Sequence, residues 1–128
     1  MEYVVRRVQI PFLDYALGCV SEQGTLWAAQ LLVEKGALDQ YGIALRNAVF
    51  HGHLSIVQFL VKQMCYKSHH KRNAVRVAAS CGHLSIIQDF EYQDVLTPEL
   101  CDQAYTIASA ARHDHIAVYL LSRSRDVE

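Results

Sequence analysis

The stretch that decides the fold is Gly52-His53-Leu54-Ser55-Ile56-Val57-Gln58-Phe59-Leu60. It returns almost unchanged as Gly82-His83-Leu84-Ser85-Ile86-Ile87-Gln88-Asp89-Phe90. The first glycines of the two copies lie 30 positions apart. Self-similarity at a fixed period of tens of residues is typical of repeat proteins, in which each copy is one supersecondary unit.

Two weaker copies flank this pair. One has Gly24 at the glycine position, 28 residues before Gly52, and the other has Asp114 there, 32 residues after Gly82. Small or apolar residues recur at fixed offsets. Seven positions before the glycine position stand Leu17, Leu45, Val75 and Ile107, and four before it stand Val20, Ala48, Ala78 and Ala110. Four copies predict four helix–turn–helix pairs, with Gly52 and Gly82 at positive φ in their turns.

The copies assign most of the chain to one all-α repeat domain. Residues 1–13 are expected to form an N-terminal capping segment in which Pro11 breaks any helix, and Asp14 is expected to cap the first helix after it. Thr97 followed by Pro98 is the clearest helix start in the chain. The domain covers residues 14–122, with repeats at residues 14–36, 43–64, 73–92 and 98–122, and residues 123–128 form a polar tail.

The predicted helices must pack on one another to be stable. Each is short, and short isolated helices are marginal in water. The helix at residues 54–64 is apolar around most of its circumference, so it must be covered on most sides. A stacked array, or solenoid, provides this cover through the partner helix and the neighbouring repeats. The alanines at offset −4 let helices approach closely, and we expect Ala78 to be buried at such a contact.

Composition and charge limit the classes of function. The chain has 128 residues, 52% apolar and 20% charged, which is typical of a globular protein. A net charge of −1 gives no general attraction to nucleic acid or to a membrane surface, and no apolar run is long enough to span a bilayer. No signal peptide is evident, and the four cysteines form no CxxC pair. We therefore expect free thiols and a cytoplasmic location.

The repeated core resembles that of the ankyrin repeat family. The residues that carry the resemblance are Val49-Phe50-His51-Gly52-His53-Leu54-Ser55-Ile56-Val57, Ala78-Ala79-Ser80-Cys81-Gly82-His83-Leu84-Ser85-Ile86-Ile87 and, as the usual end of a repeat, Leu31-Leu32-Val33-Glu34-Lys35-Gly36-Ala37. The resemblance extends over residues 14 to about 122 and implies a solenoid of about four helical pairs. The family's Thr-Pro opening is absent and the periods are short, so the β-hairpin fingers between repeats are expected to be trimmed or absent.

The resemblance implies a non-catalytic module that binds another protein through its stacked-repeat surface. Divergent arrays of this kind also resemble ankyrin proteins of intracellular bacteria and of large viruses of protists. An alternative is therefore a bacterial or viral effector, or a regulator of one, that inhibits a partner enzyme by binding. Such a protein would act in the cytosol of a host cell. A small metal- or thiol-dependent enzyme is a third hypothesis.

The seven histidines could indicate a metal or catalytic site. The histidines that follow the glycine position are His53, His83 and His115. The family's stacking would hold them one repeat apart, whereas zinc needs ligands around a single point. A nucleophile–base pair could join Cys81 to His51 or His113, but no residue is evident to orient the base. We therefore predict no catalytic residues, no metal ligands and no cofactor.

The most lopsided group of charges surrounds residues 67–72. Its members are Lys62, Lys67, His69, His70, Lys71, Arg72 and Arg76. One interpretation is a solvated loop, and the other is a docking site for an acidic partner, which would act mainly on the association rate. Nucleic acid is not expected as the partner, because one loop is a small footprint and Tyr66 is the only aromatic residue beside it.

The resemblance also implies that positions −5, −2 and −1 before the glycine position face the binding side. The residues at these positions are Cys19, Glu22, Gln23, Asn47, Phe50, His51, Val77, Ser80, Cys81, Ser109, Arg112 and His113. Phe50 is a large apolar residue at an expected exposed position, where it could anchor an interface or pack on a neighbouring loop.

The last helix, expected near residues 115–122, is apolar on nearly every side. We expect part of it to be covered by a partner, by a second copy of the chain in a homo-oligomer, or by further residues. The alternative is that Tyr119 lies flat over this end. The predicted partner-binding residues are Asn47, Phe50, His51, Lys67, His69, His70, Lys71, Arg72, Ser80, Cys81, Arg112, His113, Tyr119 and Leu120.

Overall fold

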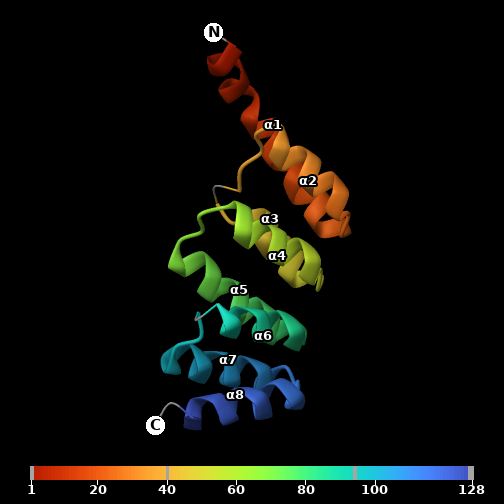
Figure 1. Ribbon diagram of the computed structural model, residues 1–128. Coiled ribbons are helices and arrows are strands. Elements are labelled where there is room, and N and C mark those ends of the chain that lie inside the picture. Colours follow the sequence, from red (N-terminus) through yellow and green to blue (C-terminus); the bar gives the residue numbers. More distant parts are fainter. Residues whose placement is uncertain (1, 40, 94, 127–128) are drawn as a thin grey trace. The chain divides into compact units, whose positions relative to one another are not determined.

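The computed structural model describes the backbone of residues 2–39, 41–93 and 95–126, and the side chains between residues 12 and 123 within these ranges. These residues form eight α-helices and no strand, which confirms the all-α prediction (Figure 1). The helices are α1 Glu2–Gln23, α2 Leu26–Glu34, α3 Ile43–Phe50, α4 Leu54–Gln63, α5 Ser68–Cys81, α6 Leu84–Tyr92, α7 Pro98–Ala110 and α8 Asp114–Asp126.

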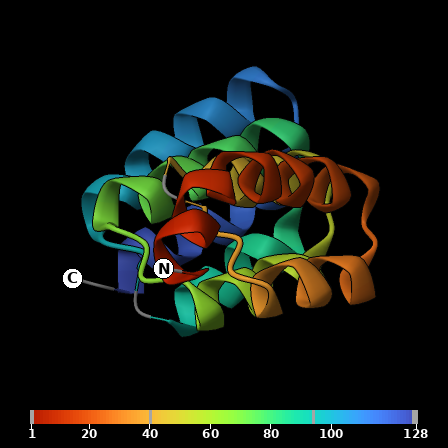
Figure 2. The same cartoon turned by 90° about the horizontal axis from the view of Figure 1, so that it is seen from above.

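The chain divides into two compact units, Met1–Cys65 and Tyr66–Glu128. In the first unit, α1 packs on both α2 and α3, and α3 packs on α4. In the second unit, α5 packs on both α6 and α7, and α7 packs on α8. Figure 2 shows that α1 and α2 run in opposite directions on either side of their short turn. Each unit therefore contains two helical pairs.

One turn geometry recurs in all four pairs. The residue with positive φ is Gly24 (82°), Gly52 (75°), Gly82 (83°) and Arg112 (66°). The next N–H donates to the carbonyl five residues earlier, in Thr25 to Val20, His53 to Ala48, His83 to Ala78 and His113 to Ala108, at 2.8–3.2 Å. The second helix begins two residues after the positive-φ residue in every pair. Gly52 and Gly82 thus confirm the predicted positive φ.

The fourth copy lies in a register two residues from the predicted one. Arg112, not Asp114, holds the left-handed turn, and Asp114 is the first residue of α8. The spacings between turns are therefore 28, 30 and 30 residues, more regular than the predicted series that ended in 32. No glycine occurs between residues 83 and 128, so only the less specific alanine pattern of residues 108–111 was left to set the register.

With the corrected register, the same positions are buried in each of the last three pairs. Eight positions before the turn residue stand Ala44, Ala74 and Ala104, four before it stand Ala48, Ala78 and Ala108, and four after it stand Ile56, Ile86 and Ile116, all at most 2% exposed. Ala78 is 0% exposed, which confirms its predicted burial. The alanines allow close helix packing, and each buried isoleucine contributes roughly 1.5–3 kcal/mol.

The amino-terminal prediction was wrong at two residues. Pro11 does not break a helix, because α1 continues through it from Glu2 to Gln23. Pro11 removes one N–H from the ladder, and the rest of α1 is held by its packing on α2 and α3. Asp14 is therefore inside α1 and not a cap; its Oδ1 instead accepts the Leu38 N–H at 2.7 Å and holds the α2–α3 loop against α1.

Of two further predicted helix starts, the one at Thr97 is confirmed and the one at Asn73 is wrong. Thr97 caps α7 as predicted, because its Oγ1 accepts the Leu100 N–H at 3.2 Å and Pro98 follows it. Helix α5 begins at Ser68 rather than at Asn73. The segment expected to be a basic loop is therefore largely the first turn and a half of a helix, carrying His69, His70, Lys71 and Arg72.

We predict that Arg112→Gly stabilises the protein by about 0.5–1 kcal/mol. Arginine pays a steric cost in the left-handed region, and glycine removes that cost at the expense of a more flexible unfolded chain. The midpoint of thermal unfolding should rise by roughly 2–5 °C. The matched control is Asp114→Gly, which weakens the first turn of α8 and should destabilise by about 0.5–1 kcal/mol. The opposite signs for this pair of variants would show that the turn lies elsewhere.

Candidate functional site

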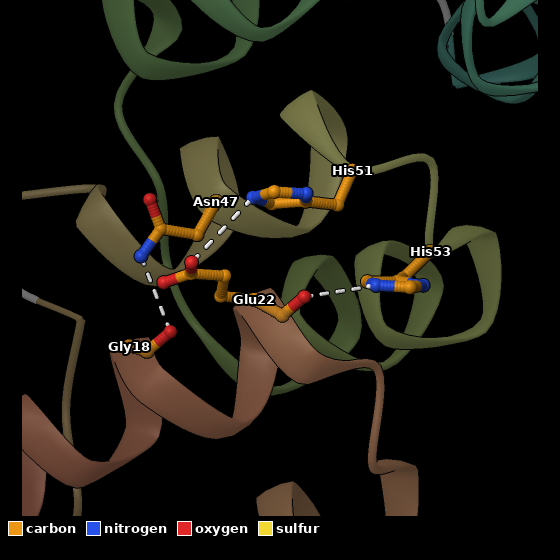
Figure 3. Close-up of polar contacts among 5 residues, drawn as sticks. All are labelled: Gly18, Glu22, Asn47, His51 and His53. Atoms are coloured by element: carbon orange, nitrogen blue, oxygen red, sulfur yellow. Dashed lines mark hydrogen bonds and ion pairs between the residues drawn. The ribbon is translucent and has the colours of Figure 1, made fainter.

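The candidate site is the exposed end of α1 and α3 in the first unit (Figure 3). It consists of Glu22 from α1, Asn47 and Phe50 from α3, and His51 and His53 from the turn after α3. We call these five residues the inner-helix cluster. Three of them, Asn47, Phe50 and His51, are predicted partner-binding residues, so the structure brings this part of the prediction together.

Asn47 joins the two helices on which the cluster is built. Its Nδ2 donates to the Gly18 carbonyl at 3.1 Å, and both groups are partly buried (Figure 3). Gly18 lies one helical turn before Glu22 in α1, and Asn47 lies one turn before His51, the residue that follows α3. The contact fixes the two helices relative to each other directly beneath the exposed residues.

His53 makes a second link to α1. Its Nε2 lies 3.0 Å from the Glu22 carbonyl (Figure 3). A carbonyl oxygen only accepts, so Nε2 carries the proton in this contact. Glu22 is in the last turn of α1, where carbonyls have no partner within the helix. The histidine ring covers Gly24 so closely that a Cβ there would meet its Cε1 at 2.6 Å.

His113 repeats this arrangement in the second unit. Its Nε2 lies 3.1 Å from the Ser80 carbonyl in the last turn of α5. A Cβ on Gly82 would meet the His113 ring at 2.9 Å. His113 was predicted to bind a partner, but its ring is used to join α5 to the turn before α8. The histidine that follows the turn residue is therefore His113 and not His115.

His51 has a different environment from His53, although only two residues separate them. Its side chain is 40% exposed, and its Nε2 lies 3.8 Å from Oε2 of Glu22, whose side chain is 58% exposed. This pair is ionic only when His51 is protonated, and an exposed pair of this kind contributes little stability. The His51 ring also meets Phe50 edge-on with centroids 5.1 Å apart.

Phe50 provides the apolar part of the cluster. It is 54% exposed, as the sequence predicted for its position. Its ring contacts the imidazole of His51, and that imidazole in turn lies beside the carboxylate of Glu22. The cluster thus offers an aromatic surface next to groups that donate and accept hydrogen bonds.

The basic residues lie in the second unit. Lys67 precedes α5, Lys71 and Arg72 lie in its first turns, and the first turn of this helix carries no acidic residue. The His69 and His70 rings are 4.1 Å apart. Ser80 is exposed and Cys81 half-buried at the other end of α5, so the 14-residue helix holds them about 15–20 Å from the basic end. These predicted residues do not form one site.

The carboxyl-terminal prediction needs correction at Leu120. Leu120 is 0% exposed, because it lies eight residues after the turn residue at a position that packs inward. It cannot touch a partner. Tyr119 lies against α6, where its hydroxyl donates to Oε1 of Glu91. The exposed apolar residues of α8 are instead Val118 (67%) and Leu121 (43%).

Arg112 is exposed, as its assignment to a binding surface requires, but its place is the turn and not the end of α7. Sequence reasoning could not identify its turn role, because arginine rarely adopts positive φ. It also gave no weight to Trp27 and Leu31 of α2, which are 70% and 43% exposed. Large apolar residues at exposed helix positions were the available signal.

Two of the cysteines, Cys81 and Cys101, have thiols with raised pKa values. Burial raises the pKa of the Cys81 thiol, and burial together with the nearby Asp102 and Glu91 carboxylates raises that of Cys101. A raised pKa lowers the thiolate fraction at neutral pH. Within the part of the chain that the structure describes, no three His, Cys, Asp or Glu side chains are grouped so that they could hold a metal ion.

No helix among the described residues is long and apolar enough to cross a lipid bilayer. Comparison of the sequence with protein-family models and with curated proteins finds no match.

We predict that His53 contributes to stability and His51 does not. His53→Ala removes a hydrogen bond to the end of α1 and should cost about 0.5–1.5 kcal/mol in the free energy of unfolding. His51→Ala, the matched control two residues away, should change it by less than about 0.5 kcal/mol. Urea unfolding of both variants measures the difference. Equal losses in the two variants would contradict the separate roles given to these histidines.

Proposed function

We propose that the chain is a divergent ankyrin-like repeat protein that binds another protein and performs no chemistry of its own. The proposal includes a solenoid of four helical pairs, for which the support is the same turn in every pair and the same buried positions in the last three. The inner-helix cluster is the proposed contact surface. The single observation that carries this choice is Phe50, which is 54% exposed on a surface that is otherwise fixed in place.

The rigidity of the surface favours recognition. Asn47 and His53 each hold α3 or its turn to α1 through a backbone carbonyl, so the cluster does not have to be ordered when a partner binds. Preorganisation of this kind reduces the entropy lost on association. Exposed aromatic residues with polar groups around them are common anchors of protein interfaces.

The rival thiol-enzyme hypothesis has less support. A nucleophilic cysteine needs a lowered pKa, whereas burial raises the pKa of Cys81. The His113 Nε2 that could act as its base is engaged with the Ser80 carbonyl. Free thiols at Cys19, Cys65, Cys81 and Cys101 fit a protein of the cytoplasm. We propose that location together with the binding function.

The basic residues of α5 would affect how fast a partner arrives. Lys67, Lys71 and Arg72 carry like charge at one helix end. Such a patch steers an acidic partner and raises the association rate at low salt, with little effect on the strength of the final complex. We assign it this supporting role and not the main contact.

We predict that Phe50→Ala weakens partner binding about tenfold or more and leaves the fold intact. The immobilised protein is used to capture partners from cell extract, and the captured proteins are quantified by mass spectrometry. A true partner should be retained at least about tenfold less by Phe50→Ala, because an aromatic anchor contributes 1.4 kcal/mol or more. Circular dichroism should show unchanged helicity, since Phe50 is exposed.

The control for this experiment is Ser55→Ala, an exposed change on α4 that should retain every partner. A partner that is retained equally by the parent, Phe50→Ala and His51→Ala would exclude the inner-helix cluster as the contact surface.

A further inference from the structure

An open groove lies between α2 and α4, the second helices of the two pairs in the first unit. Its volume is about 620 Å³, within the roughly 300–1,000 Å³ typical of sites that hold ligands. It is separate from the inner-helix cluster, which α1 and α3 carry. The residues that line the groove are Trp27, Gln30, Leu31, Val33, Glu34, Phe59 and Gln63.

The second unit has the same positions on α6 and α8, and there they are joined by polar contacts. In the register of the turns, Val33 corresponds to Glu91, Phe59 to Tyr119 and Gln63 to Arg123. The Tyr119 hydroxyl donates to Oε1 of Glu91, and Nε of Arg123 lies 2.6 Å from Oε2 of the same carboxylate. The Arg123 guanidinium also lies over the Tyr119 ring, 4.7 Å from its centre.

The first unit lacks these groups, so Val33 and Phe59 give the groove an apolar surface beside its polar residues. Valine and phenylalanine at the corresponding positions cannot form the carboxylate–hydroxyl–guanidinium contacts. Two more positions are polar in the second unit, Ser85 and Asp89, and large and apolar in the first, Trp27 and Leu31. Trp27 is 70% and Leu31 43% exposed, so these two positions place large apolar side chains in contact with water. The corresponding positions of the second unit do not, because they hold polar residues. Apolar surface of this kind is typical of a binding site.

The charge at the edge of the groove points to the chemistry of an occupant. Glu34 is an exposed carboxylate in the last turn of α2, where the negative end of the helix dipole adds to its charge. No Lys, Arg or His among the described residues forms an ion pair with it. Trp27 and Glu34 lie seven residues apart, on one face of α2, with Leu31 between them.

We propose that this groove binds a segment of a partner protein that presents an arginine beside a large apolar side chain. The guanidinium pairs with the Glu34 carboxylate and lies against the Trp27 indole, as Arg123 pairs with Glu91 and lies over Tyr119 in the second unit. The apolar side chain packs on Leu31 and Phe59. Arginine suits this place better than lysine because its planar group can stack and form two parallel hydrogen bonds.

Trp27 makes the test direct, because it is the only tryptophan in the chain. The probes are three blocked, alanine-rich helical peptides without aromatic residues, each with one leucine and one arginine three, four or seven positions apart. At least one should shift the Trp27 emission to shorter wavelength and protect it from acrylamide in a saturable way. Replacing the arginine of that peptide by glutamate should weaken binding by about tenfold or more.

Two protein variants complete the test. Glu34→Gln should weaken binding of the arginine peptide by about tenfold and should not weaken binding of the glutamate peptide, which loses a like-charge repulsion. The matched control, Glu22→Gln in the inner-helix cluster, should bind both peptides like the parent. Circular dichroism confirms that each variant is folded. The peptide assay is independent of the proposed function, because it uses no partner captured from cell extract.

Three outcomes would overturn the proposal. In the first, none of the three peptides changes the Trp27 signal. In the second, arginine and glutamate peptides bind equally, or Glu34→Gln has no effect. In the third, Trp27 emission depends on the concentration of the protein alone and sedimentation shows a dimer, which assigns the groove to a second copy of the chain.

Discussion

Each helical pair depends on one left-handed residue in its turn. The positive φ at Gly24, Gly52, Gly82 or Arg112 lets the next N–H reach back to a carbonyl in the last turn of the first helix. That hydrogen bond reverses the chain within two residues, so the second helix starts at a fixed place. The register of every buried position after the turn follows from it, including isoleucine at position +4 in Ile56 and its equivalents.

The turn also places a histidine where two pairs meet. The residue after the left-handed one immediately precedes the second helix, and its ring reaches the preceding pair in His53 and in His113. In each case the ring donates to a carbonyl at the end of a helix, a group that otherwise needs water. A β-carbon on Gly24 or Gly82 would collide with this ring. Glycine therefore serves both the backbone angle and the contact between pairs.

The sequence predicted what this local chemistry determines and missed what depends on packing. Helix type, the turns at Gly52 and Gly82 and the burial of Ala78 could be predicted because identical short stretches recur. The fourth register could not, because Arg112 adopts an angle that arginine seldom shows. The groove beside Trp27 could not be predicted either, since it forms only where residues of two separate helices, α2 and α4, come together in the folded chain.

The central claim is that all four turns have the same geometry. Arg112 tests it most directly, because an arginine at this position does not predict a left-handed turn. The measurement is the nuclear Overhauser effect between the amide and α protons of Arg112, together with hydrogen exchange of the His113 amide. The account predicts the strong intraresidue effect of a positive φ and a protected His113 amide, donated to Ala108. A weak effect at Arg112 with rapid exchange at His113 would contradict it.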